Sequence, residues 1–318
     1  MRNILVTGGA GFIGSHLCER LADGGDRVIG LDNFDPFYDP RIKRANIAAL
    51  TGRDNFRLVE GDIRDLDLLE RLFGGDGAPD VVVHLAAKAG VRPSIEDPLA
   101  YQDVNVTGTA NLLEMCRRHK VGKFVYASSS SVYGNNHKVP FAEDDPVDHP
   151  ISPYAATKKA GELLCHTYHH LFGLPVFCLR FFTVYGPRQR PEMAIHKFAR
   201  LIREGQSLPV FGDGGSERDY TYIDDIIDGV VRSIDHCRGY RIYNLGESQT
   251  TSLRRLISLI EEHMGTSARL DFKPMQPGDV NRTYADLTRS REELGYRPTV
   301  PVERGIPLFI EWFGGNET

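Results

Sequence analysis

The stretch Asn3-Ile4-Leu5-Val6-Thr7-Gly8-Gly9-Ala10-Gly11-Phe12-Ile13-Gly14 decides the fold class of this chain. Its first five residues predict a short buried strand, and helical periodicity follows the glycines through Leu21. Gly8, Gly11 and Gly14 permit a tight turn, a close approach of backbone amides to a pyrophosphate, and close contact between helix and strand. The stretch therefore predicts the first strand, turn and helix of a dinucleotide-binding unit.

A second strand, Arg27 to Leu31, ends in Asp32, which stands 18 residues after Gly14. An acidic residue at this place accepts hydrogen bonds from ribose hydroxyls and repels a 2′-phosphate, which favours NAD over NADP. An ordinary glycine turn followed by an aspartate is the alternative. The complete strand, helix and strand order favours the cofactor interpretation.

The remaining sequence alternates apolar strand-like runs with helical stretches. The predicted strands are Phe56 to Val59, Val81 to His84, Lys123 to Ala127 and Val176 to Leu179, and the predicted helices are Leu66 to Phe73, Pro98 to His119 and Tyr154 to Phe172. This alternation predicts an α/β fold with a doubly wound parallel sheet. The pattern changes after Arg180, so we expect an NAD-binding domain over residues 1–180, rejoined by about 222–250, and a smaller C-terminal substrate lobe over 181–221 and 251–318. The acidic run Glu143-Asp144-Asp145 predicts a solvated loop.

Composition narrows the class of protein. The chain has 318 residues and a net charge of −5, which disfavours a nucleic-acid partner. It contains no apolar run long enough for a membrane span and enters a strand at once, so we expect neither a span nor a signal peptide, and a cytoplasmic location. The five cysteines lack a C-x-x-C pair and are expected to be reduced packing residues. His166, His169 and His170 favour a solvated helix face, and no metal is expected.

Tyr154 and Lys158 are one helical turn apart and share a helix face. A free phenol has a pKa of about 10, and an ammonium close to it lowers that value by on the order of three units. A solvated helix pair is the alternative, but the dinucleotide motif favours a catalytic pair. We therefore predict that Tyr154 is a base and that Lys158 activates it.

Further motifs occur in a fixed order along the chain. They are Gly61-Asp62-Ile63, His84-Leu85-Ala86-Ala87, Asn105-Val106-Thr107-Gly108-Thr109, a serine run before Val132-Tyr133-Gly134, Arg218-Asp219-Tyr220 and Pro277-Gly278-Asp279. With these motifs the chain resembles the extended short-chain dehydrogenase/reductase superfamily. Within it, the resemblance is to nucleotide-sugar epimerases, most closely the UDP-glucuronate 4-epimerases, and it covers nearly the whole chain.

The resemblance implies a tightly bound NAD that is regenerated in each turnover. Asp62 and Ile63 would contact adenine, Lys158 would hold the nicotinamide ribose, and Lys88 stands where close relatives are expected to have glutamine. The implied cofactor set is Gly8, Gly11, Phe12, Ile13, Gly14, Asp32, Asn33, Asp62, Ile63, Leu85, Ala86, Ala87, Lys88, Asn105, Tyr154 and Lys158.

The serine run separates possible reactions. The resemblance places at Ser129 the hydroxyl that hydrogen-bonds the reacting sugar hydroxyl; a packed, serine-rich strand end is the alternative. In related sugar dehydratases, the resemblance places an Asp-Glu pair at the next two positions. In UDP-glucuronate decarboxylases, it places a Glu directly before Val-Tyr-Gly. Here Ser130 and Ser131 offer no carboxyl acid or base. The expected reaction is therefore oxidation and re-reduction at C4 through a transient 4-keto sugar.

The expected substrate is UDP-glucuronate and the expected product UDP-galacturonate. The segments 32–40 and 183–194 both resemble the glucuronate branch. Arg190 would grip the carboxylate, although an exposed arginine is nearly as good an interpretation. Arg218 and Arg282 would bind the diphosphate, and Val210 and Phe211 would pack against the base. The full substrate set is Arg92, Ser129, Ser130, Ser131, Thr183, Arg190, Val210, Phe211, Arg218 and Arg282.

Three alternatives stay open at this point: a UDP-glucose-type neutral sugar epimerase, a UDP-glucuronate decarboxylase, and a non-catalytic NAD-binding module. The resemblance also implies a homodimer. Two helices of each subunit, about Pro98 to His119 and Tyr154 to Phe172, would form a four-helix bundle.

Overall fold

A seven-stranded parallel sheet forms the centre of the computed structural model, which describes residues 1–75, 77–274 and 282–315. The Pro277-Gly278-Asp279 motif lies outside these described residues. The strand order is β11-β6-β5-β4-β1-β2-β3, and every neighbouring pair is parallel. The strands are β1 Asn3–Thr7, β2 Arg27–Asp32, β3 Phe56–Glu60, β4 Val81–His84, β5 Lys123–Ser129, β6 Val176–Phe181 and β11 Tyr240–Leu245. The predicted doubly wound α/β class is confirmed.

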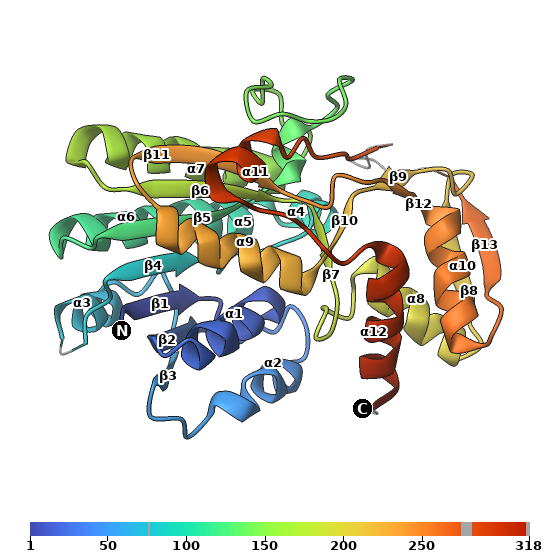
Figure 1. Cartoon of the computed structure of the whole chain (residues 1–318), viewed down its shortest axis with the longest axis horizontal. Coiled ribbons are helices and arrows are strands. Elements are labelled where there is room, and N and C mark those ends of the chain that lie inside the picture. The colour runs from blue at the N-terminus through green and yellow to red at the C-terminus, as the bar shows by residue number, and fades with distance from the viewer. Residues whose placement is uncertain (76, 275–281, 316–318) are drawn as a thin grey trace.

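Helices cover both faces of this sheet (Figure 1). On one face lie α3 (Leu66–Gly74), α6 (Gly108–Arg118) and α7 (Pro153–Phe172), which bury Phe73, Leu113 and Cys165 in one apolar cluster. On the other lie α1 (Phe12–Asp23) and α9 (Ile223–His236), which bury Leu17 and Ile227 in a second cluster. Burial on both faces explains why central strands such as β1, β4 and β6 are mostly apolar rather than alternating, whereas the edge strand β3 has exposed charged residues.

A smaller lobe lies beside the sheet, at the right of Figure 1. Its elements are α8 Ala194–Arg203, β8 Ser207–Phe211, α10 Leu253–Met264, β13 Arg269–Lys273 and α12 Val302–Gly315. Short pairs join it to the sheet: β7 Thr183–Tyr185 with β10 Tyr220–Tyr222, and β9 Glu217–Arg218 with β12 Thr251–Ser252. The apolar cluster of α1 and α9 continues through Ile202, Leu256 and Phe309, so one core connects both parts.

The remaining elements are short. They are α2 Pro40–Asn46, a 3₁₀ turn Ala48–Leu50, α4 Val91–Glu96, α5 Pro98–Gln102, a 3₁₀ turn Ser130–Tyr133 and α11 Thr288–Leu294. Among the described helices, none is long and apolar enough to cross a bilayer.

The expected single helix from Pro98 to His119 is interrupted. A π-helical turn, Asp103–Thr107, separates α5 from α6. Within it, the side-chain amide nitrogen of Asn105 donates to the Lys88 carbonyl at 3.0 Å and to Thr157 Oγ1 at 3.0 Å. The side-chain oxygen of Asn105 accepts from the backbone amide of Lys88 at 2.8 Å. These bonds fix the turn to its neighbours, as is common for π turns at functional sites.

The prediction of a solvated loop at residues 143–145 was wrong for Glu143. This side chain is buried, and its carboxylate accepts a hydrogen bond from the backbone amide of Asn244 at 2.7 Å. Asp144 is exposed and pairs with Arg289 at 2.6 Å. A run of like charges in the sequence does not show which member has a buried partner.

Candidate active site

A cavity of about 470 Å³ opens at the carboxyl ends of the central strands. The glycine turn forms its floor and is packed closely: a Cβ on Gly14 would lie 2.0 Å from the Gly8 carbonyl oxygen. Gly8 has φ +70, and a Cβ there would lie 2.9 Å from the Ala86 amide nitrogen. Only glycine therefore fits these two positions, and the turn leaves the N-terminus of α1 open to the cavity.

Asp32 closes β2 at this cavity. Its carboxylate accepts from the Ala10 amide at 3.1 Å and the Phe34 amide at 2.8 Å, and the Lys43 ammonium is 3.7 Å away. Lys43 lines the same cavity from α2 and is buried. The sequence interpretation missed this lysine, because nothing in the helix pattern of α2 marks it as buried.

Asn33 and Asp62 meet at the same end of the cavity, where the Asn33 amide donates to Asp62 Oδ2 at 2.9 Å. The hydrogen bond from Arg64 lowers the pKa of Asp62 to about 2, so this carboxylate is an ionised acceptor near neutral pH. The predicted cofactor residues lining the cavity are Gly8, Gly11, Phe12, Ile13, Gly14, Asp32, Asn33, Asp62, Ile63, Leu85, Ala86, Ala87, Lys88, Tyr154 and Lys158. Asn105 lies behind it and holds the Lys88 backbone. The N-terminus of α1, which the turn directs at the cavity, and the acidic groups beyond it fit a dinucleotide.

Ser129, Tyr154 and Lys158 line the cavity where β5 ends beside α7. Ser152 caps α7 by accepting a hydrogen bond from the Ala155 amide at 3.1 Å, which fixes the first turn that carries Tyr154. The Lys158 ammonium donates to the Ala127 carbonyl at 2.7 Å and lies 5.9 Å from the centre of the Tyr154 ring. The structure thus brings together all three residues predicted to be catalytic.

Burial dominates the ionisation of this pair. Burial raises the pKa of Tyr154 above its ordinary value, while a hydrogen bond with Ser129 and the positive charge of Arg190 act in the opposite direction. Burial also lowers the pKa of Lys158 to about 8. We expected Lys158 to lower the pKa of Tyr154, and this direction is wrong for this chain. Loss of hydration disfavours both the phenolate of Tyr154 and the ammonium of Lys158.

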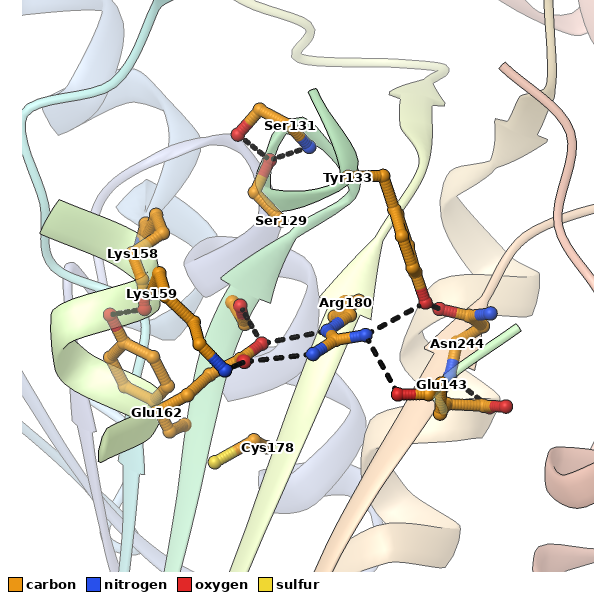
Figure 2. Close-up of polar contacts among 12 residues, drawn as sticks. Ser129, Ser131, Tyr133, Glu143, Lys158, Lys159, Glu162, Cys178, Arg180 and Asn244 are labelled. Atoms are coloured by element: carbon orange, nitrogen blue, oxygen red, sulfur yellow. Dashed lines mark hydrogen bonds and ion pairs between the residues drawn. The ribbon is translucent and has the colours of Figure 1, made fainter. Parts of the chain in front are cut away.

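A buried ion pair supports the segments that carry these groups. Figure 2 shows Arg180 between Glu162 and Tyr133. Two guanidinium nitrogens donate to the Glu162 carboxylate at 2.8 and 2.9 Å, and a third donates to the Tyr133 hydroxyl at 2.9 Å. Ser128, next to Ser129, donates to the same carboxylate at 2.7 Å. The pair therefore connects α7, β5, β6 and the turn after Ser129, and no motif in the sequence indicated it.

Six of the residues predicted to bind substrate line this cavity or a second one next to it. Ser129, Ser130, Thr183 and Arg190 line it, and a second cavity of about 200 Å³ shares Ser130 and Thr183 and adds Ser131 and Arg218. The Arg190 guanidinium pairs with Glu192 through Nε at 3.1 Å and lies 5.9 Å from the centre of the Phe37 ring.

Four predicted substrate residues line neither of these two cavities. Arg92 stacks on the Phe211 ring at 4.6 Å, which joins α4 to the end of β8. Val210 is buried in the apolar core, and Arg282 pairs with Glu217 at 2.8 Å. Contact of these four with a ligand stays a prediction.

Residues 4–246 match the NAD dependent epimerase/dehydratase family, and the chain belongs to this family. The chain is 44% identical over 329 residues to UDP-glucuronate 4-epimerase 1 of Arabidopsis thaliana, covering 98% of this chain and 76% of that protein. It is also similar to the UDP-glucuronic acid 4-epimerase from Bacillus cereus in complex with UDP-glucuronic acid and NAD, with a TM-score of 0.92, 40% identity, and 98% and 99% coverage of the two chains. The UDP-glucose 4-epimerase of Thermotoga maritima with UDP-glucose matches with a TM-score of 0.91, 34% identity, and 98% and 99% coverage.

Proposed function

We propose that this protein is a UDP-glucuronate 4-epimerase, an NAD-dependent isomerase that interconverts UDP-glucuronate and UDP-galacturonate through a transient 4-keto sugar. The observation that carries this proposal is the meeting of Ser129, Tyr154 and Arg190 in one cavity with the glycine turn. Relatives with the same architecture carry this name, and one was solved with UDP-glucuronic acid and NAD.

The side chains support the following roles. Tyr154 takes the proton of the sugar 4-hydroxyl while Ser129 hydrogen-bonds that oxygen, and the charge of Lys158 stabilises the phenolate. Bound NAD supplies the oxidation and reduction at C4. Tyr154 returns the proton after the opposite face of the sugar has turned toward the cofactor side. Because the 4-keto form of a glucuronate is a β-keto acid, Arg190 would hold its carboxylate ionised and still, which opposes loss of carbon dioxide.

The site favours epimerisation over elimination or decarboxylation. Ser130 and Ser131 present hydroxyls where those reactions would use carboxyl groups. Among the described cavity-lining residues, the carboxylates are Asp32, Asp35 and Asp62, which lie at the end of β2 or after β2 and β3 rather than after β5. Arg190 lines the same cavity as Tyr154 and offers a cation for a sugar carboxylate, which a neutral sugar lacks.

A division of labour between the two parts accompanies this function. Residues 1–180, with about 222–250, would hold NAD, and residues 181–221 and 251–318 would hold the nucleotide sugar. Arg218 lines the second cavity, which supports a contact with the diphosphate, and Arg282 and Arg92, which are exposed, would add positive charge near it. Val210 and Phe211 would provide the surface for the base.

Proton NMR tests the proposal directly. UDP-glucuronate is incubated with the purified protein without added NAD, and the C4 configuration is followed. Appearance of UDP-galacturonate is expected. A pentose signal after loss of C6 would show a decarboxylase, and conversion of UDP-glucose in preference to UDP-glucuronate would show the neutral-sugar enzyme. An unchanged spectrum, even with added NAD, would show a non-catalytic module.

A homodimer through α5, α6 and α7 belongs to the same proposal. Leu99, Leu163 and Leu171 on these helices are 75%, 57% and 62% exposed, which is unusual for leucines on two neighbouring helices. Sedimentation of Leu163→Glu should show monomers where the parent chain shows dimers, and an unchanged dimer would exclude this face. We also propose a cytoplasmic location, because all five cysteines are free and buried, as suits a reducing compartment.

A further inference from the structure

One ion pair joins opposite sides of the main cavity. The Lys88 ammonium lies 3.5 Å from Asp35 Oδ2, and both residues line the cavity. Lys88 is the residue at which this sequence departs from the glutamine expected in close relatives. Its charge therefore has a partner that the sequence did not indicate.

The topology places this pair over the glycine turn. Asp35 follows β2 and Lys88 follows β4, and these strands lie on either side of β1 in the sheet order β4-β1-β2. The turn from Gly8 to Gly14 leaves β1 between them. An ion pair between the two flanking loops therefore spans the part of the cavity whose floor is the glycine turn.

Both ends of the pair are fixed by their backbones. Asn105 exchanges hydrogen bonds with both the amide and the carbonyl of Lys88, at 2.8 and 3.0 Å. The Asp35 amide donates to Asn33 Oδ1 at 3.0 Å, and Asp35 Oδ1 accepts from the Phe37 amide at 2.9 Å. Asp35 Oδ2 is the oxygen that meets Lys88, so the backbone bond and the ion pair use different oxygens. Opening the pair thus requires only movement of side chains.

We infer that Asp35 and Lys88 form a clasp over the dinucleotide, and that Asp35 is a determinant of cofactor retention. The inference rests on the proposed NAD-dependent function. The Lys88 side chain is 26% exposed and the Asp35 side chain 32%, so the clasp is partly hydrated and should open readily and more often at high salt. A cofactor that must survive many turnovers without exchange gains from such a barrier.

Release of NAD is the measurement that tests the clasp. Purified protein loaded with NAD is mixed with an excess of the fluorescent analogue 1,N⁶-etheno-NAD, and exchange is followed by fluorescence. Lys88→Gln and Asp35→Asn should each speed exchange by roughly threefold to fivefold, as expected for loss of a partly exposed ion pair. The double variant should exchange no faster than either single variant, because both remove the same contact. The exchanged pair, Lys88→Asp with Asp35→Lys, should restore much of the slow rate.

Arg255→Gln is the matched control, because Arg255 pairs with Glu303 at the same 3.5 Å distance between α10 and α12 and lines neither cavity. Faster exchange in Lys88→Gln alone would overturn the clasp and show that Lys88 contacts the cofactor itself. Equal rates in all variants would overturn it as well. Because the readout is dinucleotide exchange, the clasp stands or falls separately from the sugar reaction; a chain that binds no NAD would overturn both.

Discussion

Arg190 shows how one side chain serves both specificity and chemistry. Its Nε is held by Glu192 at 3.1 Å, which leaves the terminal nitrogens of the guanidinium free of that ion pair. Its charge also lowers the pKa of Tyr154 against the opposing effect of burial. Removal of Arg190 should therefore change two separate properties.

We expect Arg190→Ala to lower kcat/KM for UDP-glucuronate by roughly 30-fold to 150-fold, because it removes a charge-assisted contact worth about 2 to 3 kcal/mol. The rise of activity with pH should also move to higher pH, because the Tyr154 phenol loses a nearby positive charge. Steady-state kinetics between pH 6 and about 10 check both effects. Arg188→Gln is the control, since Arg188 pairs with Glu19 at 2.9 Å. An equal loss with acidic and neutral sugars would exclude the carboxylate grip.

His84 is a second residue whose burial has a measurable consequence. Its ring lies between Thr7 Oγ1 at 2.8 Å and Thr109 Oγ1 at 3.0 Å, and burial lowers its pKa from 6.5 to about 3. Between these pH values the unfolded chain binds more protons at this site than the folded chain. The stability that neutral His84 contributes is thus present above about pH 6.5 and is lost as the pH falls toward 3.

Urea unfolding of the parent chain and His84→Gln should show this directly. The difference in free energy of unfolding should be constant above about pH 7 and should narrow by up to about 1.4 kcal/mol per pH unit in acid. Comparing the two proteins cancels the opposite contribution of Asp219, whose pKa is raised to about 6 by burial. A difference that stays constant down to pH 4 would show that the folded chain binds a proton at His84 as readily as the unfolded chain does, so that the pKa of His84 is not lowered.

At the scale of elements, α7 depends on the ion pair between Glu162 and Arg180. Both side chains are 1% exposed, so each neutralises a charge that water does not reach. Lys159 adds a longer contact to Glu162 at 3.5 Å. Gly161 lets the helix approach β5, because a Cβ there would lie 2.1 Å from the Tyr126 hydroxyl.

We expect Glu162→Ala to lower the free energy of unfolding by about 3 to 5 kcal/mol, because it leaves Arg180 buried without its partner. Adding Arg180→Met should recover part of this loss, since an apolar pair of similar volume is tolerated better than a single buried charge. Thermal or urea unfolding of the two variants checks the order. If the double variant were less stable than the single one by the full cost of a second deletion, the two residues would not act as a pair.

The elements themselves were largely predictable from the sequence, for a physical reason. Strands such as Val81–His84 are buried on both faces and read as short apolar runs, and Ser152 before Pro153 marks the start of α7. The π-helical turn at Asp103–Thr107 was not predictable, because it depends on contacts of Asn105 with Lys88 and Thr157 rather than on local periodicity.

Across the whole molecule, some parts of the site could be predicted from the sequence and others could not, as for the helices and strands. Glycine spacing and the Tyr154 and Lys158 pair lie within short motifs, so the sequence located them. Glu162 with Arg180 and Asp35 with Lys88 join residues far apart along the chain, and only the folded sheet shows that they meet. The ionisation of Tyr154 also depends on burial by the complete fold, which explains why the helical spacing alone gave the wrong direction.

The proposed epimerase inverts C4 while the enzyme retains the hydrogen that was removed from C4. The measurement is proton and deuterium NMR of UDP-glucuronate carrying deuterium at C4, incubated with the protein in ordinary water and without added NAD. We predict UDP-galacturonate that keeps the deuterium at C4, because the hydrogen removed from one face is the hydrogen returned to the other. Product with ordinary hydrogen at C4, or label lost to water, would exclude epimerisation through a hydride that the enzyme retains.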